Sequence, residues 1–267
     1  MTRLEILGVG VDHLTMEEAL AHIADFIKTG RPHQVVTANP EMVMDSRRDQ
    51  ELALILREAD LVTADGVGIV WAARQLGGPP EKPADRTSDR TPVKPDKPLE
   101  RITGVELTDA LLRLAANSGY HIYLLGGAEG VAAEAARRVT ASYPGLKVAG
   151  VHHGYFRPDE EPAVVRGIFQ LQPEILLVGL GSPRQEKWIR HHLHELGVPV
   201  CTGVGGTLDI LAGTSRRAPA WMQRSGLEWL YRLLRQPSRF GRMLAIPRFM
   251  AAVLAEKPRR RRKSTLR

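Results

Sequence analysis

The sequence predicts an α/β fold: a mostly parallel sheet flanked by helices, followed by a basic helical C-terminal appendage. Short β-branched runs alternate with helical patterns over residues 16–203, a spacing typical of a parallel sheet covered by helices. Several of these runs end in polar, glycine-rich turns, the place where such sheets bind ligands. Beyond Gly213 the pattern changes to arginine-rich helical segments.

Six apolar runs have the length and composition of buried strands. They cover residues 34–37, 61–63, 121–125, 147–151, 175–179 and 198–203. Six helical patterns precede or separate them, over residues 16–29, 50–59, 107–118, 130–142, 161–171 and 184–196. In this order the elements predict a Rossmann-like sheet.

Composition divides the chain into unequal parts. Residues 1–213 form the predicted α/β body, 214–256 a helical appendage, and 257–267 a basic tail. Within the body, residues 79–98 contain six prolines among mostly charged residues, which predicts an exposed flexible loop. The chain has one cysteine, Cys201, so it can form neither an intramolecular disulfide nor an all-cysteine zinc site.

Charge follows the same division. Residues 214–267 carry 15 Lys or Arg and two acidic residues, a net charge of +13, whereas the 22 basic and 28 acidic residues before them give −6. Such asymmetry indicates a polyanionic partner: nucleic acid, an anionic membrane or a phosphate-rich substrate. No apolar run reaches about 18 residues and no signal peptide is visible, so we expect a cytoplasmic protein with at most peripheral membrane contact.

The appendage combines apolar and basic residues at helical spacing. Trp221, Trp229 and Leu233 alternate with arginines, and a second apolar segment covers residues 244–254. An apolar face with tryptophan and flanking arginine predicts an interfacial helix. A helix that packs on the body or on another subunit would give the same pattern.

Polar residues at the ends of two predicted strands form the first candidate site. Thr37 and Asn39 lie two residues apart, so their side chains share one face. Asp65 follows the next strand and precedes a glycine, where its carboxylate can face a ligand. The alternatives are an Asx turn before Pro40 and a helix-capping role for Asp65.

Motifs across residues 5–245 resemble the WecG/TagA/CpsF glycosyltransferases and occur in the order of that family. They cover residues 37–39, 64–68, 101–104, 124–130, 178–188, 203–209, 217–219 and 226–233. The Pro-rich loop 79–98 departs from the family pattern and looks like an insertion just before Arg101.

The resemblance implies an inverting transfer of a sugar, typically N-acetylmannosamine, from a UDP-sugar to polyprenyl-diphosphate-linked N-acetylglucosamine in cell-surface polysaccharide or teichoic acid linkage synthesis. It implies a peripheral enzyme at the inner face of the cell membrane, whose appendage docks on the anionic bilayer and completes the active site. Some relatives transfer glucose or another hexose in exopolysaccharide assembly, so the sugar stays open, as does a homo-oligomer.

The resemblance also assigns roles to residues of the body. Asp65 becomes the general base, because an inverting transfer needs a group that takes the proton of the acceptor hydroxyl. Thr37, Asn39 and Gln185 become sugar contacts, and Arg101 becomes a phosphate contact.

Further roles fall on the later motifs. Asp209 is placed near the nucleobase, where a carboxylate can accept from uracil N3–H. Gly126 and Gly127 open a helix whose amides can hold a phosphate. Three appendage arginines, with planar guanidinium groups suited to a diphosphate, complete the set: Arg232, Arg239 and Arg242.

We predict no metal and no cofactor besides the UDP-sugar donor. The chain lacks an Asp-x-Asp motif, and its histidine clusters lack a matching carboxylate set. A nucleotide-dependent oxidoreductase is the alternative enzyme, disfavoured because residues 126–130 read Gly-Gly-x-x-Gly. A nucleic-acid-binding protein is the non-enzymatic alternative, disfavoured because aromatic residues are 5% of the chain and gather on the appendage's apolar face.

Overall fold

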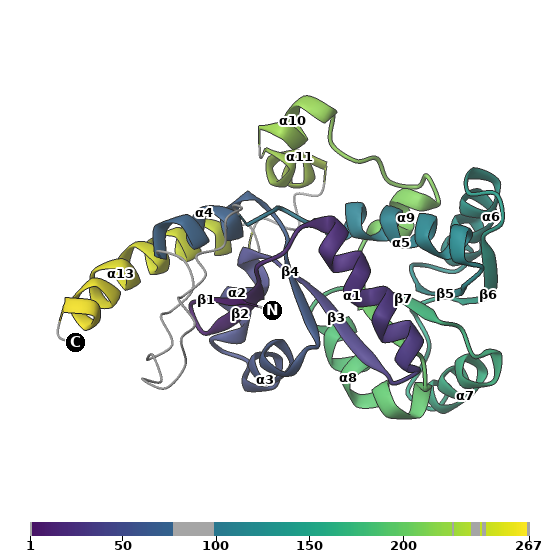
Figure 1. Cartoon of the computed structure of the whole chain (residues 1–267). Coiled ribbons are helices and arrows are strands. Elements are labelled where there is room, and N and C mark those ends of the chain that lie inside the picture. Colours follow the sequence, from purple (N-terminus) through teal and green to yellow (C-terminus); the bar gives the residue numbers. More distant parts are fainter. Residues whose placement is uncertain (1, 77–98, 226, 236–240, 242–243, 266–267) are drawn as a thin grey trace.

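In the computed structural model the body is built on a six-stranded sheet whose neighbouring strands all run parallel, in the order β4-β3-β8-β7-β5-β6 (Figure 1). The structure describes residues 2–76, 99–225, 227–235, 241 and 244–265. The strands are β3 (His33–Ala38), β4 (Leu61–Ala64), β5 (His121–Gly126), β6 (Lys147–His152), β7 (Ile175–Gly179) and β8 (Val200–Gly203). The predicted parallel sheet and its six strands are confirmed.

Helices cover both faces of this sheet (Figure 1). One face carries α1 (Met16–Thr29), α5 (Gly104–Ser118), α6 (Val131–Ser142) and the short α9 (Thr207–Leu211); the other carries α7 (Glu161–Leu171) and α8 (Arg184–Leu196), with α3 (Gln50–Glu58) beside α8. Alternate residues of β5 divide between the two cores: Ile122 and Leu124 pack with α5 and α6, and Tyr123 and Leu125 pack with α7 and α8. Burial on both faces explains the continuous apolar runs of the sequence.

An N-terminal hairpin, β1 (Arg3–Ile6) and β2 (Val9–Asp12), was not predicted from the sequence. It is fixed by the buried carboxylate of Asp12, whose Oδ1 accepts from Arg3 Nε (2.8 Å) and whose Oδ2 accepts from the backbone N–H of Val62 in β4 (2.8 Å). Two further helices were also missed: α2 (Pro40–Ser46) and α4 (Val67–Leu76).

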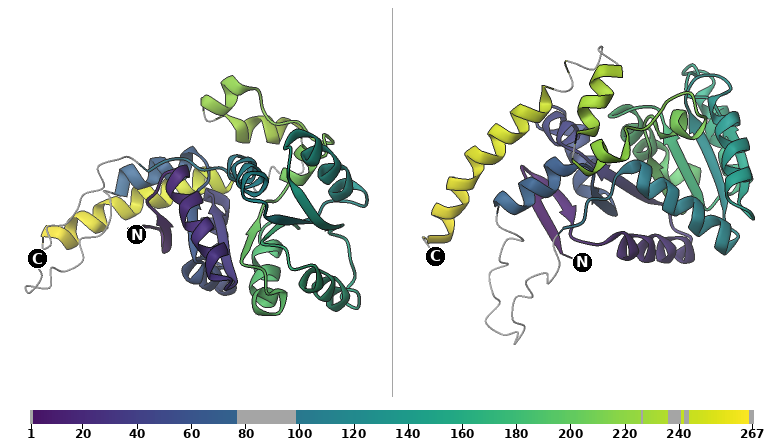
Figure 2. Two further views of the ribbon diagram at one scale, coloured as in Figure 1. Left: turned by 45° about the vertical axis from the view of Figure 1, so that its right-hand side comes forward. Right: turned by 90° about the horizontal axis from the view of Figure 1, so that it is seen from above.

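Among the described residues of the C-terminal part are the helices α10 (Ala220–Arg224), α11 (Glu228–Arg235) and α13 (Ala245–Thr265). Figure 2 shows α10 and α11 as a pair that projects from the body, while α13 runs along α2 and α4. Phe249 and Val253 of α13 are fully buried in the core of the hairpin and β3–β4, whereas Met250 and Leu254 on its other side are exposed. In the described part of the chain, no helix is long and apolar enough to cross a membrane.

The predicted boundaries at residues 213 and 256 stay predictions. The Pro-rich loop 79–98 lies outside the described residues, as do the side chains of the basic tail 257–267.

The two adjacent residues Phe249 and Met250 give a matched test of how α13 is attached. Phe249→Ala should lower the free energy of unfolding by about 3 kcal/mol, because it leaves a cavity in the core. Met250→Ala should change it by less than about 0.5 kcal/mol, because Met250 is 43% exposed. Urea unfolding followed by circular dichroism measures both; equal losses would contradict the packing described here.

Candidate active site

A polar cavity of about 630 Å³ opens at the carboxyl ends of β3, β4 and β8 and at the turn after β7. Five of the residues predicted from the sequence line it together: Thr37, Asn39, Asp65, Gln185 and Asp209. The structure therefore gathers residues separated by up to 172 positions at one edge of the sheet, the edge where parallel sheets bind ligands.

β3 and β4 place the first three of these residues. The backbone N–H of Asp65 donates to the carbonyl of Ala38 (2.8 Å), which holds Asp65 beside the end of β3. Asn39 is the N-cap of α2, and its Oδ1 accepts from the backbone N–H of Met42 (2.9 Å). Asn39 therefore has a local structural role before Pro40, as a helix cap and not as the Asx turn considered from the sequence, and the same side chain lines the cavity. Thr37 is nearly buried in the cavity wall.

Gln185, in the first turn of α8, is held by bonds at both ends of its amide. Its Oε1 accepts from the backbone N–H of Gly205 (3.0 Å), and its Nε2 donates to Glu186 Oε1 (2.7 Å). Residue 203 is a glycine because a Cβ at this position would collide with the side-chain amide of Gln185. Gln185 therefore shapes the turn after β8 as well as lining the cavity.

Glu186 is a buried carboxyl group directly behind the cavity wall. Its backbone carbonyl accepts from Gln34 Nε2 (2.9 Å), and its side chain is bonded to Gln185 and Ser182. Burial raises the pKa of Glu186, because a charged carboxylate loses solvation there. The Glu186 side chain therefore supports Gln185 and Ser182, which are two of the residues that line the cavity.

Asp209 lies on α9, and its backbone directs the chain toward the appendage. Its carbonyl accepts from the backbone N–H of Ser215 (3.0 Å) and from Thr214 Oγ1 (3.0 Å). The segment that follows contributes Arg216 and Arg217 to the cavity, and α11 contributes Glu228 and Tyr231. The cavity is therefore built from the body and from the appendage.

An ion-pair network lies where the body meets the C-terminal appendage. Oε1 of Glu106 accepts from Nη2 of Arg217 (2.9 Å) and from Nη2 of Arg101 (3.1 Å), while its Oε2 accepts from the backbone N–H of Thr103 (3.3 Å). Burial alone would raise the pKa of Glu106, but the hydrogen bonds from Arg217 and Thr103 and the charge of Arg101 outweigh it and lower that pKa. Glu106 is consequently ionised at neutral pH.

Three predicted positions are placed differently from the expectation. Arg101 is not among the described residues that line the cavity; it lies beside them, on a segment tied to β4 by the bond from the Ile102 N–H to the Ala64 carbonyl (2.8 Å). Gly126 and Gly127 are also absent from that lining. A Cβ at Gly126 would collide with the Gly179 carbonyl, and the Gly127 N–H already donates to that oxygen (3.2 Å). Close packing against Gly179 thus accounts for Gly126, whereas a Cβ at Gly127 would collide with the side chain of Val131.

The predicted appendage arginines cannot be placed. Arg239 and Arg242 lie outside the described residues, and so does the side chain of Arg232, although its backbone belongs to α11. Sequence reasoning missed Arg217, Glu228 and Tyr231 as cavity residues. Their motifs at 217–219 and 226–233 were noticed, but those motifs gave no indication of what the side chains contact.

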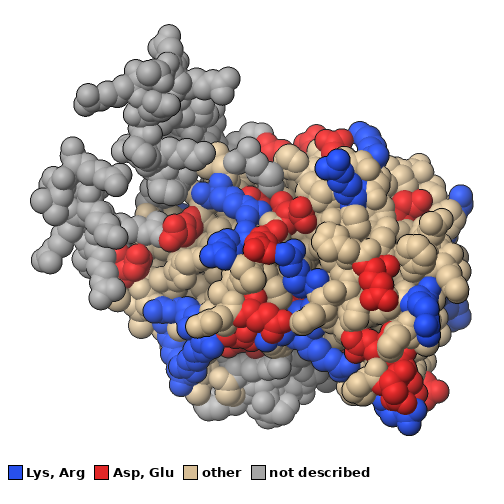
Figure 3. Space-filling model, turned by 90° about the horizontal axis from the view of Figure 1, so that it is seen from below, with Lys and Arg blue, Asp and Glu red and all other residues tan. Residues whose placement is uncertain are grey.

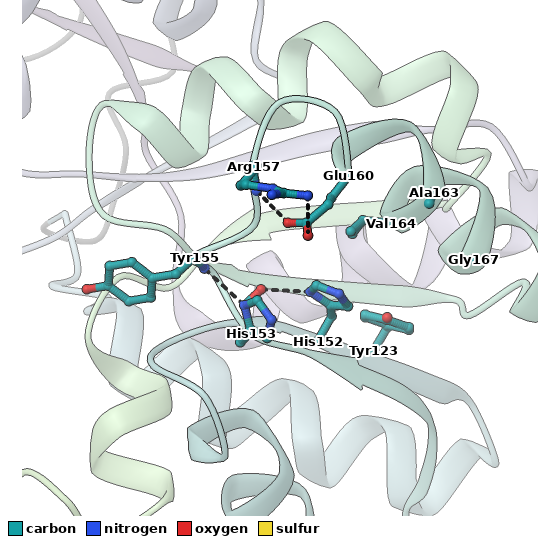
Figure 4. Close-up of a pocket in the computed structure, with 9 residues that line it drawn as sticks. All are labelled: Tyr123, His152, His153, Tyr155, Arg157, Glu160, Ala163, Val164 and Gly167. Atoms are coloured by element: carbon teal, nitrogen blue, oxygen red, sulfur yellow. Dashed lines mark hydrogen bonds and ion pairs between the residues drawn. The ribbon is translucent and has the colours of Figure 1, made fainter.

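A second cavity, of about 650 Å³, lies beyond the end of β6 and contains none of the predicted site residues (Figure 4). His152 Nδ1 donates to the carbonyl of His153 (2.8 Å), and His153 Nδ1 accepts from the backbone N–H of Tyr155 (3.2 Å). Across the cavity, Arg157 pairs with Glu160 (3.4 Å). Within the part of the chain that the structure describes, no three His, Cys, Asp or Glu side chains are grouped to hold a metal ion.

The face that carries α3, α8 and α7 has a mixed charge. Basic and acidic side chains are interspersed over it (Figure 3). Lys187 of α8, for example, pairs with Asp49 (2.7 Å) and Glu51 (2.8 Å) at the start of α3. These pairs join α3 to α8 and offset the basic charge of this face.

A parallel sheet with a polar cavity at its carboxyl edge is the arrangement in which α/β proteins bind their ligands. The particular family follows from comparison with known proteins, because the model of the glycosyl transferase WecG/TagA/CpsF family matches residues 4–88 and 94–263. The chain belongs to this family and is a glycosyltransferase. The match breaks at residues 89–93, inside the loop predicted as an insertion over 79–98.

Curated relatives cover nearly the whole chain. The chain is 33% identical over 258 residues to an N-acetylglucosaminyldiphosphoundecaprenol N-acetyl-beta-D-mannosaminyltransferase of Staphylococcus aureus strain MW2, covering 96% of this chain and 93% of that protein. The protein of the same name from strain NCTC 8325 / PS 47 has the same identity and coverage. The family resemblance read from the motifs is therefore confirmed.

Proposed function

We propose that this glycosyltransferase moves N-acetylmannosamine from a UDP-sugar to polyprenyl-diphosphate-linked N-acetylglucosamine, with inversion at the anomeric carbon. The observation that carries the proposal is the cavity that gathers Thr37, Asn39, Asp65, Gln185 and Asp209. The names of the Staphylococcus aureus relatives support the transferred sugar and the acceptor.

In this mechanism the acceptor hydroxyl attacks the anomeric carbon as the bond from that carbon to the UDP oxygen breaks. Asp65 takes the hydroxyl proton, and UDP leaves with the electron pair of the broken bond. Asp65 is suited to this role because it stands at the end of β4 on the cavity wall. Arg101, held beside that wall by Glu106, stays proposed as the contact for the leaving diphosphate.

Other residues of the cavity wall recognise the donor. Asp209, on α9, accepts from uracil N3–H, while Thr37 and Asn39 hydrogen-bond to the sugar. Arg232, Arg239 and Arg242 stay proposed as further diphosphate contacts from the appendage. No step of this mechanism uses a metal ion, since guanidinium groups supply the positive charge.

The appendage also supports peripheral contact with an anionic membrane at the inner face of the cell membrane. Trp221 of α10 is 60% exposed and Leu234 of α11 is 71% exposed. Apolar side chains in these positions, within a chain segment with a net charge of +13, fit a surface of anionic lipid that also holds the polyprenyl acceptor.

A panel of UDP-sugars tests the reaction. With a short polyprenyl-diphosphate N-acetylglucosamine acceptor, UDP-N-acetylmannosamine should give the fastest turnover and a product of inverted anomeric configuration. UDP-glucose and UDP-N-acetylglucosamine are the comparison donors, and nuclear magnetic resonance identifies the anomer. Faster transfer of glucose would assign the enzyme to the hexose-transferring relatives, and a retained configuration would exclude the inverting mechanism.

Replacement of Asp65 tests the general base. Asp65→Asn should lower kcat by about 100- to 10,000-fold, because the amide cannot take the proton. Affinity for UDP, measured by calorimetry, should stay within about twofold, since UDP contacts other residues. Asp25→Asn, in an exposed pair with Lys28, is the control and should keep full activity. Normal turnover of Asp65→Asn would remove Asp65 from this role.

Vesicle binding tests the membrane contact. The full chain should sediment with vesicles containing phosphatidylglycerol, and added salt should weaken the binding. Trp221→Ala should lower the affinity by about tenfold, because a large apolar side chain no longer inserts. Tyr155→Ala, which removes an aromatic residue 76% exposed at the second cavity, should have no effect. Tighter binding to oligonucleotides than to vesicles would contradict the membrane proposal.

A further inference from the structure

One carboxylate oxygen joins two arginines at the border of the cavity. Glu106 Oε1 accepts from Arg217 (2.9 Å) and from Arg101 (3.1 Å), and both side chains are mostly buried. Guanidinium groups stay charged at all relevant pH values, so one anion holds two cations beside each other. Repulsion between these cations is relieved when a second anion binds near them. A diphosphate is such an anion.

Arg217 also reaches the appendage. Its Nε is buried and lies 3.6 Å from Oε1 of Glu228, the first residue of α11. Glu228 is only 14% exposed and lines the cavity together with Tyr231 of the same helix. Arg217 therefore stands between α5 of the body and α11 of the appendage.

The appendage helices form a unit of their own. The backbone N–H of Leu227 donates to the carbonyl of Met222 (2.8 Å), which joins α11 to α10. The chain enters this unit through the segment fixed at the Asp209 carbonyl. The contact between Arg217 and Glu228 adds a side-chain attachment at the start of α11, which constrains the orientation of α11 relative to the body.

On the basis of the glycosyl transfer proposed above, we propose that Arg217 is a positioning residue that seats α11 against the cavity and couples this seat, through Glu106, to the orientation of Arg101. When α11 is seated, Glu228 and Tyr231 close one side of the cavity, and Glu106, held by Arg217, keeps Arg101 at the border of the cavity. Loss of Arg217 removes the contact that holds α11 at Glu228. It also leaves Arg101 as the one cation of this pair that is bonded to Glu106.

Three variants of the full chain test this coupling: Arg217→Ala, Arg217→Lys and Glu228→Gln. Arg217→Ala should lower kcat/KM by about 10- to 100-fold, the range expected for loss of one charge-assisted hydrogen bond. Lysine keeps the charge without the planar group that bridges two carboxylates, so Arg217→Lys should recover only part of this loss. Glu228→Gln should cost about tenfold in the wild-type background and less than about twofold in the Arg217→Ala background.

Hydrogen exchange supplies a readout that does not depend on turnover. Amides of residues 220–231 should exchange faster in Arg217→Ala and in Glu228→Gln, whereas those of α5 and β5 should not change. Arg137→Gln, which removes an exposed pair with Glu134, is the control for both measurements. Vesicle binding should also be unchanged, since the exposed apolar residues remain.

The outcomes separate the two proposals. Absence of sugar transfer by the wild-type chain, with faster exchange in Arg217→Ala, would reject the proposed function and retain the seating of α11. Active wild type with unchanged exchange in Arg217→Ala would overturn the seating. Equal costs of Glu228→Gln in both backgrounds would overturn the coupling through Arg217.

Discussion

The parallel direction of all six strands is the constraint on which the molecule depends. It brings every carboxyl end to one edge of the sheet, so residues far apart in the chain meet there. It also requires a helical crossover between strands, which covers both faces and leaves the strands mostly apolar. Polar chemistry is consequently concentrated at the strand ends, as with Thr37 of β3, and in the turns, and the cavity forms where four of these turns meet.

Buried polar groups keep those turns in place. Asp12 ties the N-terminal hairpin to β4, and Gln185 ties the start of α8 to the turn after β8. Glu106 does the same for the start of α5, where its bond to the Thr103 backbone completes a capping box. Each group satisfies backbone donors that would otherwise be unpaired at the edge of the sheet, so the shape of the cavity and the stability of the fold depend on the same bonds.

The sequence was sufficient to predict the main sheet and five of the residues that line the cavity. Buried parallel strands are continuous apolar runs, and site residues that directly follow such strands, as Asp65 does, are placed by the strand itself. The hairpin was missed because its strands have four residues each and turn through Leu7 and Gly8, both at positive φ. Arg217 was missed because its partner Glu106 lies 111 residues away, and no local pattern records such a contact. The role of Gly126 stays a prediction, because a turn packed closely against a neighbouring strand and a turn that holds phosphate both need glycine.

The packing of α13 fixes the exposed side of this helix relative to the cavity. α13 lies along α2 and α4, and these helices begin just after Asn39 and Asp65. Phe249 and Val253 fasten the three helices into one block, so the exposed side of α13 and the cavity keep a constant separation. At the membrane surface proposed above, this block would fix the height of the cavity above the lipid, and that height would select acceptors by how far their sugar stands from the membrane.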